Sequence, residues 1–542
     1  MLTIKPSLLR SALAALGLAL ICLAGGSALA SPAHASTGQW SIMSDDNQLH
    51  NNPVNTLSQM RALGVTMVKV TVRWNSIAPA YTARHAPRGF KASNPGSYPS
   101  GNWSYLDTVV RTAAQDGIKV GFMVTGPAPV WAEGPGIPRG HAAKIGNWKP
   151  SAPDFGAFVR ALGTRYDGHY VPSGASAALP AVSWWSIWNE PNFGPDLAPQ
   201  AIDGERIDSA AFMYRALLGH AWGALRASGH TTSNNTILIG ETAPRGRQGA
   251  HFPGNFSGTL PLIFVRALYC ASPSDRRLTG AAARANHCPT SASAFRAQNP
   301  ALFGSSGFAD HPYAQGTPPN LPTYACGGAF CVNPRTHRSD PNYADFPEIP
   351  RLQSLLQRLG SVYGVHHRVP IWSTEYGFWT RPPDRSSGAI SPDLAAYYMN
   401  WAEYLSYRNP SILSYAQYLL VDPSTGVFSS GLELANGREL ATYAAFRMPL
   451  YMPSTSARSA TSLTVWGGVR PAAYAVGLPV ADIQFKPASG GPWTTVRPVT
   501  VNGPRGYFNV KVPFTSSGQV RLAWSPAPGQ TDYSRTQAIR IG

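Results

Sequence analysis

The stretch WWSIWNEPNF, residues 184–193, begins with an almost entirely apolar run and then presents Asn189, Glu190 and Pro191 in succession. A short apolar run rich in aromatic residues is typical of a strand that is buried on both faces. Proline lacks the backbone N–H that a further residue of the sheet would donate. We therefore predict a core strand that ends at a cleft, with the Glu190 carboxylate at its end.

Seven other runs of this kind lie between residues 39 and 453, and segments with helical spacing alternate with them. The eight predicted strands are Trp40–Ser44, Met67–Val72, Lys119–Val124, Val182–Trp188, Thr236–Gly240, Gly307–His311, Val369–Thr374 and Ile412–Leu419. Strands that alternate with helices predict an α/β fold with a parallel sheet. Eight of them predict a (β/α)8 barrel over residues 36–453, in which functional side chains lie at the carboxyl ends of the strands.

After Pro453 the pattern changes to short alternating segments that are separated by Gly and Pro, and no helical stretch follows. Such a pattern predicts a small β-sandwich over residues 454–542. Glycan binding, attachment to a cell wall and packing against the barrel all remain open as its role. We interpret the three tryptophans of this region as core residues: Trp466, Trp493 and Trp524.

The first 35 residues have the features of an export signal. Lys5 and Arg10 precede an apolar run from Ala12 to Leu23, and a small-x-small cleavage pattern ends at Ala35. The apolar run is shorter than the roughly 20 residues that span a bilayer, so a membrane anchor is the weaker interpretation. No later stretch is long and apolar enough to span, and we expect a secreted, extracellular protein without a membrane span in the mature chain.

The whole chain of 542 residues has a formal net charge of +17. Removal of residues 1–35 takes away Lys5 and Arg10 and no acidic residue, which leaves +15. This excess can steer a protein toward an anionic cell-wall polymer or another anionic surface. However, the charge comes mostly from scattered arginines, and no basic helix or nucleic-acid motif is present. We therefore do not expect nucleic acid as a partner.

Four cysteines remain after export, and an even number in an oxidising compartment favours disulfides. Proximity in the sequence favours Cys270 with Cys288 and Cys326 with Cys331 among the three possible pairings. A zinc site that uses His287 or His337 is the alternative. These spacings match no standard zinc-ligand pattern, so we predict no metal site.

A second predicted strand ends as the first does. In RVPIWSTEYGF, residues 368–378, an apolar run leads to Glu375. Glu190 ends the fourth predicted strand and Glu375 the seventh, so both carboxylates are expected at the mouth of one barrel. Glycoside hydrolysis needs two such carboxyls, one to protonate the leaving oxygen and one to attack or stabilise the anomeric carbon. The two groups must also differ in protonation at one pH.

The motifs IWNEPN (187–192) and TEYG (374–377) resemble those of clan A of the glycoside hydrolases, nearest to families 5 and 39. The resemblance implies that Glu190 is the acid/base, that Glu375 is the nucleophile and that the reaction retains configuration. It also implies a hydrogen bond from Asn189 to the sugar 2-hydroxyl. Further segments that resemble clan members are VTVRWNSIAP (70–79), PVWA (129–132), RYDGHY (165–170) and DHPY (310–313).

The chain departs from the clan pattern in two places. Clan members commonly have an arginine that contacts the nucleophile five residues before the position of Trp74, and here Lys69 stands there, with Arg73 as an alternative on the same strand face. The predicted eighth strand lacks a tryptophan that often floors the sugar site in family 5, and Tyr415 or Tyr418 is the candidate replacement.

Lys69, Trp74 and Asn189 are candidate substrate-binding residues. The remaining candidates also follow predicted strands. His311 and Tyr313 lie where the sixth strand ends, and Trp131 and Trp379 offer ring faces that can stack on sugars. Core packing is the alternative for each of these four. Glu241 ends the fifth strand and offers a third polar contact in the site, although an ion pair with Arg245 is the plainer interpretation.

The sequence therefore predicts a secreted retaining O-glycoside hydrolase that acts on a polysaccharide or oligosaccharide without a cofactor. A non-catalytic or weakly active glycan-binding protein of the cell surface is the alternative, based on Lys69 and the basic charge. A transglycosylase shares both glutamates and differs only in the access of its acceptor. The sugar, the linkage, endo or exo action and the oligomeric state stay open, because specificity resides in variable loops rather than in the glutamate pair.

Overall fold

The computed structural model describes residues 36–140, 146–202, 205–247, 254–321, 340–386, 388–459 and 461–542. The predicted export signal, the predicted Cys326–Cys331 pair and His337 lie outside these residues. Among the described helices, none combines the length and the apolar character that crossing a bilayer requires.

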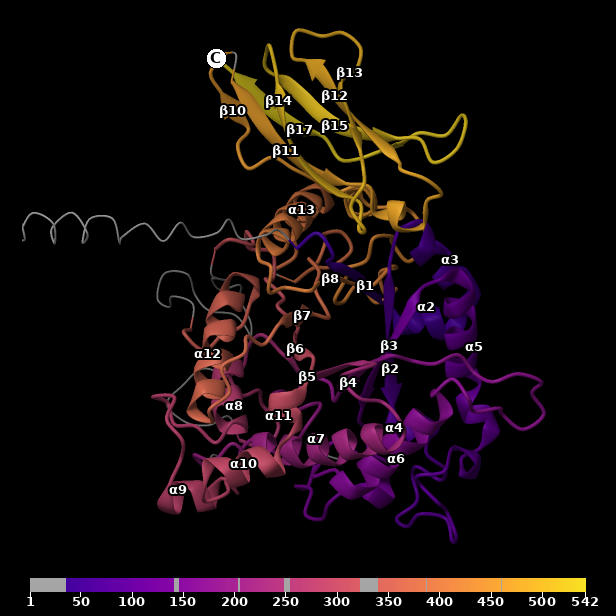
Figure 1. The fold of residues 1–542 in the computed structure, drawn as a ribbon, viewed down its shortest axis with the longest axis vertical. Helices are drawn as coiled ribbons and strands as arrows, with labels where there is room; N and C mark the ends of the chain where they lie inside the picture. Colours follow the sequence, from indigo (N-terminus) through magenta and orange to yellow (C-terminus); the bar gives the residue numbers. More distant parts are fainter. Residues whose placement is uncertain are drawn as a thin grey trace, which may run out of the picture.

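Eight parallel strands form the barrel at the centre of Figure 1. They are β1 (Trp40–Ser44), β2 (Met67–Arg73), β3 (Lys119–Thr125), β4 (Trp184–Ile187), β5 (Thr236–Thr242), β6 (Gly307–Asp310), β7 (Ile371–Ser373) and β8 (Ser414–Tyr418). Each strand pairs with its neighbour in sequence, and β1 also pairs with β8. A parallel bridge between Ile371 and Ile412 joins β7 to the start of β8 and completes the circle. The predicted (β/α)8 fold is confirmed.

Helices surround the barrel. The α-helices are α2 (Asp46–Asn51), α3 (Pro53–Ala62), α4 (Trp74–Ile77), α5 (Ser100–Asp116), α6 (Ala152–Arg165), α7 (Ser209–Ala227), α8 (Pro261–Leu268), α9 (Gly280–Ala285), α10 (Ala292–Gln298), α11 (Ala301–Gly304), α12 (Ile349–Val362), α13 (Pro392–Arg408) and α14 (Ala441–Arg447). Short 3-10 helices are η1 (Pro95–Ser97), η2 (Val130–Ala132), η5 (Phe346–Glu348) and η6 (Arg470–Tyr474). The Asp208 side chain caps α7 by accepting the backbone N–H of Ala211, a common way to satisfy a helix start.

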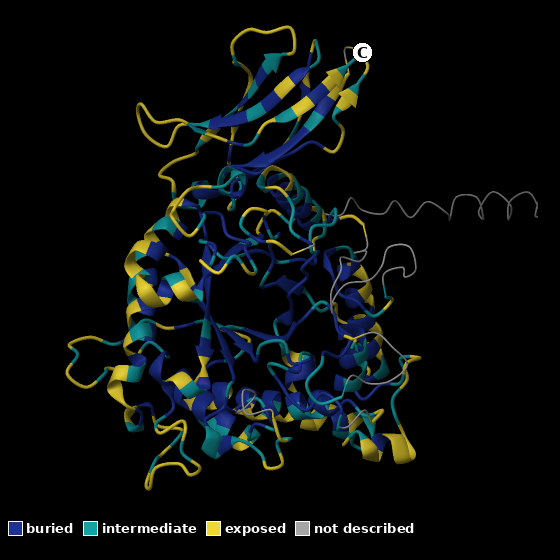
Figure 2. Cartoon of the chain, turned by 180° about the vertical axis from the view of Figure 1, so that it is seen from behind, coloured by how far each residue is buried: buried dark blue, intermediate teal, exposed yellow. Residues whose placement is uncertain are grey.

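The apolar face of each long helix packs on the strands. Tyr214, Leu217 and Leu218 of α7 are buried, as their helical spacing predicts. Figure 2 shows the barrel strands in the colour of buried residues, whereas exposed residues gather on the outward side of the helices. The interior of the barrel is therefore a packed core, and only its carboxyl end is available for a site.

The last part of the chain forms two antiparallel sheets that pack face to face. The strands are β9 (Leu450–Tyr451), β10 (Ser456–Ala457), β11 (Ser462–Gly468), β12 (Val480–Pro487), β13 (Thr494–Thr500), β14 (Tyr507–Pro513), β15 (Gly518–Trp524), β16 (Asp532–Tyr533) and β17 (Gln537–Ile541). One sheet has the order β10-β17-β15-β12-β13, with β16 beside β15, and the other is β14-β11-β9. The predicted β-sandwich is confirmed, and its first strand, β9, begins before residue 454.

The sandwich packs on the barrel through α13 (Figure 1). Glu403 of α13 is fully buried there, where it accepts hydrogen bonds from Arg470 Nη2 at 2.7 Å and Tyr507 Oη at 2.6 Å. Trp466 is fully buried in the same contact and stacks on Tyr507. Trp493, by contrast, is only half-buried and lies over the Arg521 guanidinium.

The predicted disulfide between Cys270 and Cys288 is present. It joins the end of α8 to the residues that follow α9. The long insertion after α8 is therefore fixed to the barrel by a covalent bond.

Candidate active site

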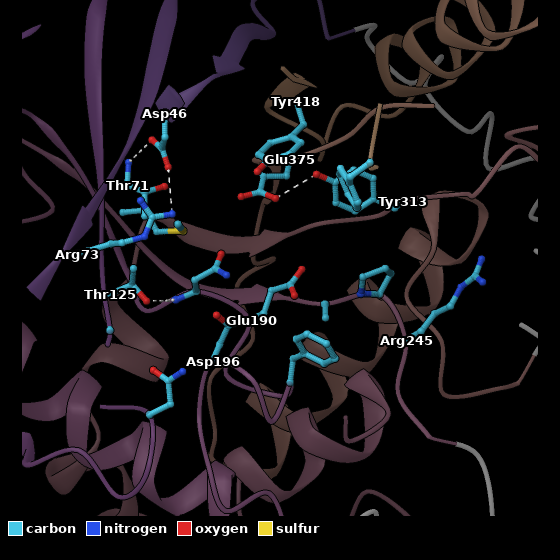
Figure 3. Close-up of a pocket in the computed structure, with 18 of the residues that line it drawn as sticks. Asp46, Thr71, Arg73, Thr125, Glu190, Asp196, Arg245, Tyr313, Glu375 and Tyr418 are labelled. Carbon is cyan, nitrogen blue, oxygen red and sulfur yellow. Dashed lines mark hydrogen bonds and ion pairs between the residues drawn. The ribbon is translucent and has the colours of Figure 1, made fainter. Parts of the chain in front are cut away.

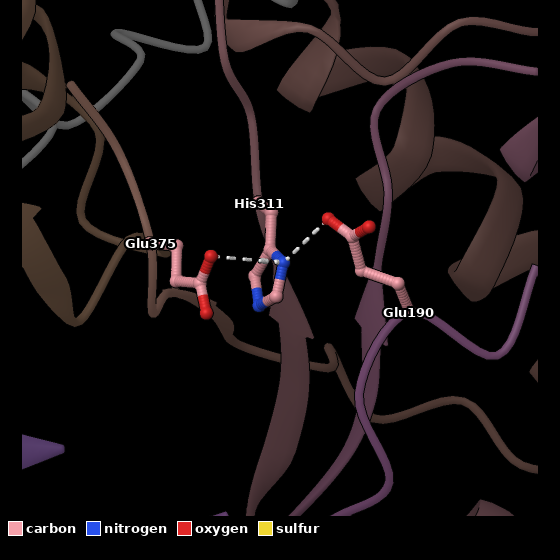
Figure 4. Close-up of side chains that lie close together, drawn as sticks. All are labelled: Glu190, His311 and Glu375. Atoms are coloured by element: carbon pink, nitrogen blue, oxygen red, sulfur yellow. Dashed lines mark hydrogen bonds and ion pairs between the residues drawn. The ribbon is translucent and has the colours of Figure 1, made fainter. Parts of the chain in front are cut away.

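Glu190 follows β4 and Glu375 follows β7, and parallel strands bring both side chains to the same end of the barrel. One carboxylate oxygen of each glutamate and one imidazole nitrogen of His311 all lie within 4.8 Å of one another. Figure 4 shows His311, from the end of β6, between the two glutamates. Residues 190, 311 and 375 are therefore brought together as the sequence predicts.

The backbone at the end of β4 is unusual. Trp188 and Glu190 have φ values of +69° and +37°, a left-handed conformation that residues other than glycine rarely adopt. Hydrogen bonds hold it in place, because the Trp188 N–H donates to Val124 and the Glu190 N–H donates to the carbonyl of Glu241 at 2.9 Å. Such strain is concentrated at functional sites, where the surrounding structure maintains it.

The Glu375 carboxylate receives three contacts. Lys69 Nζ donates to Oε1 at 2.9 Å, Tyr313 Oη donates to Oε2 at 3.0 Å, and His311 Nδ1 lies 3.5 Å from Oε2. Burial by itself raises the pKa of Glu375, but the positive charges of His311 and Lys69 outweigh it and lower the pKa below its ordinary value. Glu375 is therefore an ionised carboxylate at neutral pH.

Lys69 supplies the contact that arginine supplies in the clan. Its ammonium is buried and also donates to Glu241 Oε2 at 2.8 Å. Arg73 does not take this position, because its half-exposed side chain points to Asp46, with 3.6 Å between Nη2 and Oδ2. A single cation on β2 thus serves two carboxylates.

His311 is fully buried between three carboxylates. Burial lowers the pKa of His311, but Glu375, Glu190 and Glu241 together outweigh that effect and raise it to about 10. The ring is therefore protonated at neutral pH, and both nitrogens donate: Nδ1 to Glu190 Oε1 at 3.0 Å and Nε2 to Glu241 Oε2 at 2.6 Å.

Glu241 was predicted to pair with Arg245, and this prediction is wrong. Arg245 instead makes a bidentate ion pair with Asp345, with both N–O distances at 3.0 Å. Glu241 accepts hydrogen bonds from the Ser186 and Thr374 hydroxyls in addition to Lys69 and His311. Within a strand, successive side chains point to opposite faces. The sequence shows that Glu241 ends a strand, but it does not show which side chains of other strands Glu241 contacts.

The charges beneath the cavity nearly balance. Lys69 and His311 are cations, and Glu241 and Glu375 are carboxylates whose pKa values lie below the ordinary value, despite burial, because of those two cations. Two buried cations therefore compensate two buried anions, as a low-dielectric interior requires. Glu190, which is 18% exposed at its side chain, contacts this set through His311 and lies at the cavity surface.

A cavity of about 610 Å³ opens over the two glutamates (Figure 3). Its wall includes Asn189, Asp196, Tyr313, Trp379, Tyr418 and Phe428. The Asn189 carboxamide oxygen is buried and has no hydrogen-bond partner among the described residues. It is thus an acceptor at the cavity wall that a ligand hydroxyl can satisfy.

Asp196 is a cavity residue that sequence reasoning missed. It lies six residues after Glu190, and Figure 3 shows the two side chains near each other. Burial is the main cause that raises the pKa of Asp196 to about 8, and the negative charge of Glu190 adds to it, while Asn189 opposes it through a hydrogen bond. No strand-end pattern marks Asp196, because it lies in the loop after β4.

The aromatic candidates divide into two groups. Trp379 and Tyr418 line the cavity, whereas Tyr415 is buried with its hydroxyl on the Met399 carbonyl. Trp74 is fully buried and stacks on a core phenylalanine, so the prediction that it binds substrate is wrong. Trp131 is not brought to the cavity either, since its ring packs on Trp74 and its N–H donates to a loop carbonyl.

Comparisons with known proteins were made for the whole chain. No family model matches it, and no curated protein matches it. Solved structures that resemble it are glycoside hydrolases and related enzymes. A family 39 glycoside hydrolase from Bacteroides cellulosilyticus WH2 is 12% identical over 89% of this chain and 80% of that one, with a TM-score of 0.44.

A glucosidase from Croceicoccus marinus is 11% identical over 94% of this chain and 98% of that one, with a TM-score of 0.47. An aphid myrosinase is 13% identical over 76% of this chain and 97% of that one, with a TM-score of 0.45. Sequence identities and TM-scores at this level do not establish the activity of this chain.

Proposed function

We propose that this protein is a secreted, retaining O-glycoside hydrolase that acts on a polysaccharide or oligosaccharide through a covalent glycosyl-enzyme. The observation that carries the proposal is the approach of a Glu190 and a Glu375 carboxylate oxygen to within 4.8 Å in one cavity. A carboxyl separation of about 5 to 5.5 Å accompanies retention, whereas about 6.5 to 9.5 Å admits the water of an inverting enzyme. The close approach of the two carboxylates supports a retaining mechanism.

Glu375 is the proposed nucleophile. Its lowered pKa keeps it ionised, and attack on the anomeric carbon converts one oxygen into an ester while the glycosidic C–O bond breaks. Lys69 and Tyr313 fix the orientation of the carboxylate by hydrogen bonds to different oxygens. These contacts hold the nucleophile in place before substrate arrives, which lowers the entropic cost of reaching the transition state.

Glu190 is the proposed acid/base. The geometry supports this role, because Glu190 faces the cavity and lies outside the compensated pairs that involve Lys69 and Glu241. In the first step Glu190 gives its proton to the departing oxygen. In the second step it takes a proton from the water that attacks the anomeric carbon, the bond between that carbon and Glu375 breaks, and Glu375 leaves as a carboxylate. His311 donates to Glu190 Oε1, which orients the acid.

Asn189 is the proposed partner of the sugar 2-hydroxyl. Its carboxamide oxygen, unpartnered among the described residues, can accept that hydrogen bond, which strengthens in the transition state of a retaining glycosidase. Export is a further part of the proposal, and the Cys270–Cys288 disulfide supports it, since such bonds persist in oxidising compartments.

A panel of para-nitrophenyl glycosides of β-linked glucose, xylose, mannose and galactose tests the proposal. The wild type should release nitrophenol from at least one member, and Glu375→Ala should abolish release while circular dichroism shows an unchanged fold. Azide should restore turnover of Glu375→Ala with inverted product, because a small anion can replace the missing nucleophile. Full turnover of Glu375→Ala without azide would reject the assignment.

Glu190→Ala serves as the matched variant. A nitrophenyl leaving group needs little protonation, so formation of the glycosyl-enzyme should be little affected in Glu190→Ala. Hydrolysis of the glycosyl-enzyme should be slowed, because the general base is missing. Proton NMR of the first product in the wild type should show the substrate anomer. Binding of glycans without release across the whole panel would favour the glycan-binding surface protein instead.

A further inference from the structure

A second chamber adjoins the catalytic cavity. It has a volume of about 590 Å³ and lies between the loop that follows β7 and the loop that follows β8. Trp379 and Phe428 line both spaces, so the chamber and the cavity meet at a junction formed by these two residues. The function proposed above uses only the cavity side of this junction.

The backbone at this junction is held in a strained conformation. Phe428 has a φ of +58°, in the left-handed region that bulky residues rarely adopt. Its ring makes edge-on contacts with Tyr313 and Tyr418, at centroid distances of 5.3 and 5.4 Å, and a tilted contact with Trp379 at 5.1 Å. Strain that the surroundings maintain points to a functional position, here one that touches the cavity wall.

Buried hydrogen bonds fix the two loops to each other. Asp384 Oδ1 accepts the backbone N–H of Ser386 at 2.7 Å, and Oδ2 accepts that of Ser429 at 3.2 Å. Thr380 N–H donates to the Ser429 carbonyl at 2.8 Å. Burial raises the pKa of Asp384, but these backbone hydrogen bonds outweigh it and lower the pKa. Two loops, which the ionised Asp384 carboxylate connects, thus form the chamber before any ligand binds.

The chemistry of the chamber wall fits a sugar ring. Trp379 and Phe428 provide ring faces at one side, and Ser386, Ser424 and Thr425 provide hydroxyl groups at the exposed side. Sugars present apolar C–H faces and polar edges, which aromatic rings and hydroxyl groups match. Asp384 already has its partners, and Arg385, the other charged residue of the described wall, is exposed to solvent.

The position of the chamber indicates which side of the scissile bond it serves. Glu190, the proposed acid, follows β4. The chamber is formed by the loops after β7 and β8, and β8 lies opposite β4 in the circle of eight strands. The leaving group must lie toward its proton donor. The chamber is therefore on the glycone side, next to the sugar unit that Glu375 attacks.

We propose that the chamber binds the second sugar unit on the glycone side, so that the enzyme releases products of two or more sugar units from its substrate. This inference rests on the proposed glycosidase activity and deepens it. It assigns a substrate class, a chain with at least two sugar units before the cleaved bond. A strict exo-enzyme that removes single sugars would instead need a closed wall at the position of the chamber.

Matched aryl glycosides test the proposal. For each sugar of the panel, kcat/KM is measured on the para-nitrophenyl monosaccharide and on the para-nitrophenyl β-linked disaccharide. We expect the disaccharide to be preferred by at least about tenfold, because binding energy from a remote sugar lowers the barrier at the reacting centre. Nitrophenol and intact disaccharide should appear together.

Thr425→Trp, which fills the chamber from its exposed rim, should bring the ratio of the two kcat/KM values down to about one. The control is Thr495→Trp, the same substitution at an exposed position of β13 in the sandwich, which should keep the wild-type ratio. Equal rates on both substrates in the wild type, or an unchanged preference in Thr425→Trp, would overturn the chamber while leaving the glycosidase assignment intact.

A binding measurement covers the case in which no aryl glycoside is cleaved. Calorimetry with the Glu375→Gln variant and β-linked gluco-, xylo-, manno- and galacto-oligosaccharides should show affinity that rises from monosaccharide to trisaccharide. Adding Thr425→Trp should remove that rise. Affinity that does not depend on length, or the absence of binding to every sugar, overturns the chamber proposal. Absence of both cleavage and binding rejects the glycosidase as well.

Discussion

Lys69 Nζ lies 2.9 Å from Oε1 of Glu375, and the same ammonium lies 2.8 Å from Glu241. A lysine thus occupies the place of the expected arginine and keeps the contact with the proposed nucleophile. A guanidinium binds a carboxylate with a planar fork, whereas an ammonium acts as a compact charge with three donors. Here the ammonium donates to two carboxylates, Glu375 and Glu241, which come from different strands.

Replacing Lys69 by methionine should lower kcat/KM by about 100-fold or more, because Glu375 and Glu241 lose their shared cation and the nucleophile is no longer held ionised and oriented. Lys69→Arg should recover part of the loss. The pH–rate profile checks the cause: in Lys69→Met the acidic limb should move to higher pH, since the pKa of the nucleophile rises. An unmoved acidic limb would contradict the role.

Tyr313→Phe should lower kcat by about tenfold with the fold preserved, because the hydroxyl that donates to Glu375 Oε2 is lost and the ring remains. Single-turnover kinetics should assign the loss to formation of the glycosyl-enzyme. A change in KM alone would assign Tyr313 to substrate binding instead of to the nucleophile.

The stability of the protein should depend on His311 at alkaline pH. The pKa of His311 is raised to about 10 in the folded protein, against roughly 6.5 when unfolded. The folded state thus gains stability from the protonated ring below pH 6.5 and loses it as the pH rises toward 10. The difference in Tm between the wild type and His311→Gln should shrink across that range. A difference that stays constant would show that the ring does not titrate there.

Asp196 should also make the protein less stable as the pH rises, but over a lower pH range. Its pKa is raised to about 8 in the folded protein, against roughly 3.9 when unfolded, so the folded state binds the proton more tightly. Stability is therefore lost as the pH rises from about 4 through 8. Asp196→Asn removes this loss, and its Tm should exceed that of the wild type by more at pH 8.5 than at pH 4. Thermal unfolding at both pH values measures the two gaps.

The contact between barrel and sandwich should depend on Glu403. Glu403→Ala leaves Arg470 buried without its anion, which costs about 3 to 5 kcal/mol of unfolding free energy. Glu439→Ala, at an exposed position, should change it by less than about 0.5 kcal/mol. Chemical denaturation compares the two variants. Equal midpoints would show that this buried ion pair does not hold the domains together.

The strand pattern could be predicted from the sequence because it is local. Each barrel strand is a short apolar run with turn-forming neighbours, and all eight predicted strands overlap β1–β8 of the structure. Parallel pairing then brings the ends of β4 and β7 to one rim, so the closeness of Glu190 and Glu375 follows from the fold class. The boundaries differ by a few residues, since the ends of strands depend on which backbone groups find partners.

The surroundings of the two glutamates were decided only by the tertiary structure. Lys69, Glu241 and His311 come from three strands, and neither residue spacing nor residue type tells which of them meet inside a barrel. The same limit explains Trp74, which lies in the core, and Trp379, which lines the cavity, although both are tryptophans close to strand ends. Asp196 and the chamber behind Phe428 belong to loops, whose paths depend on long-range packing. Local pattern determined the strands and the placement of the two acids at their ends, whereas contacts between distant segments determined their charge states and the shape of the site.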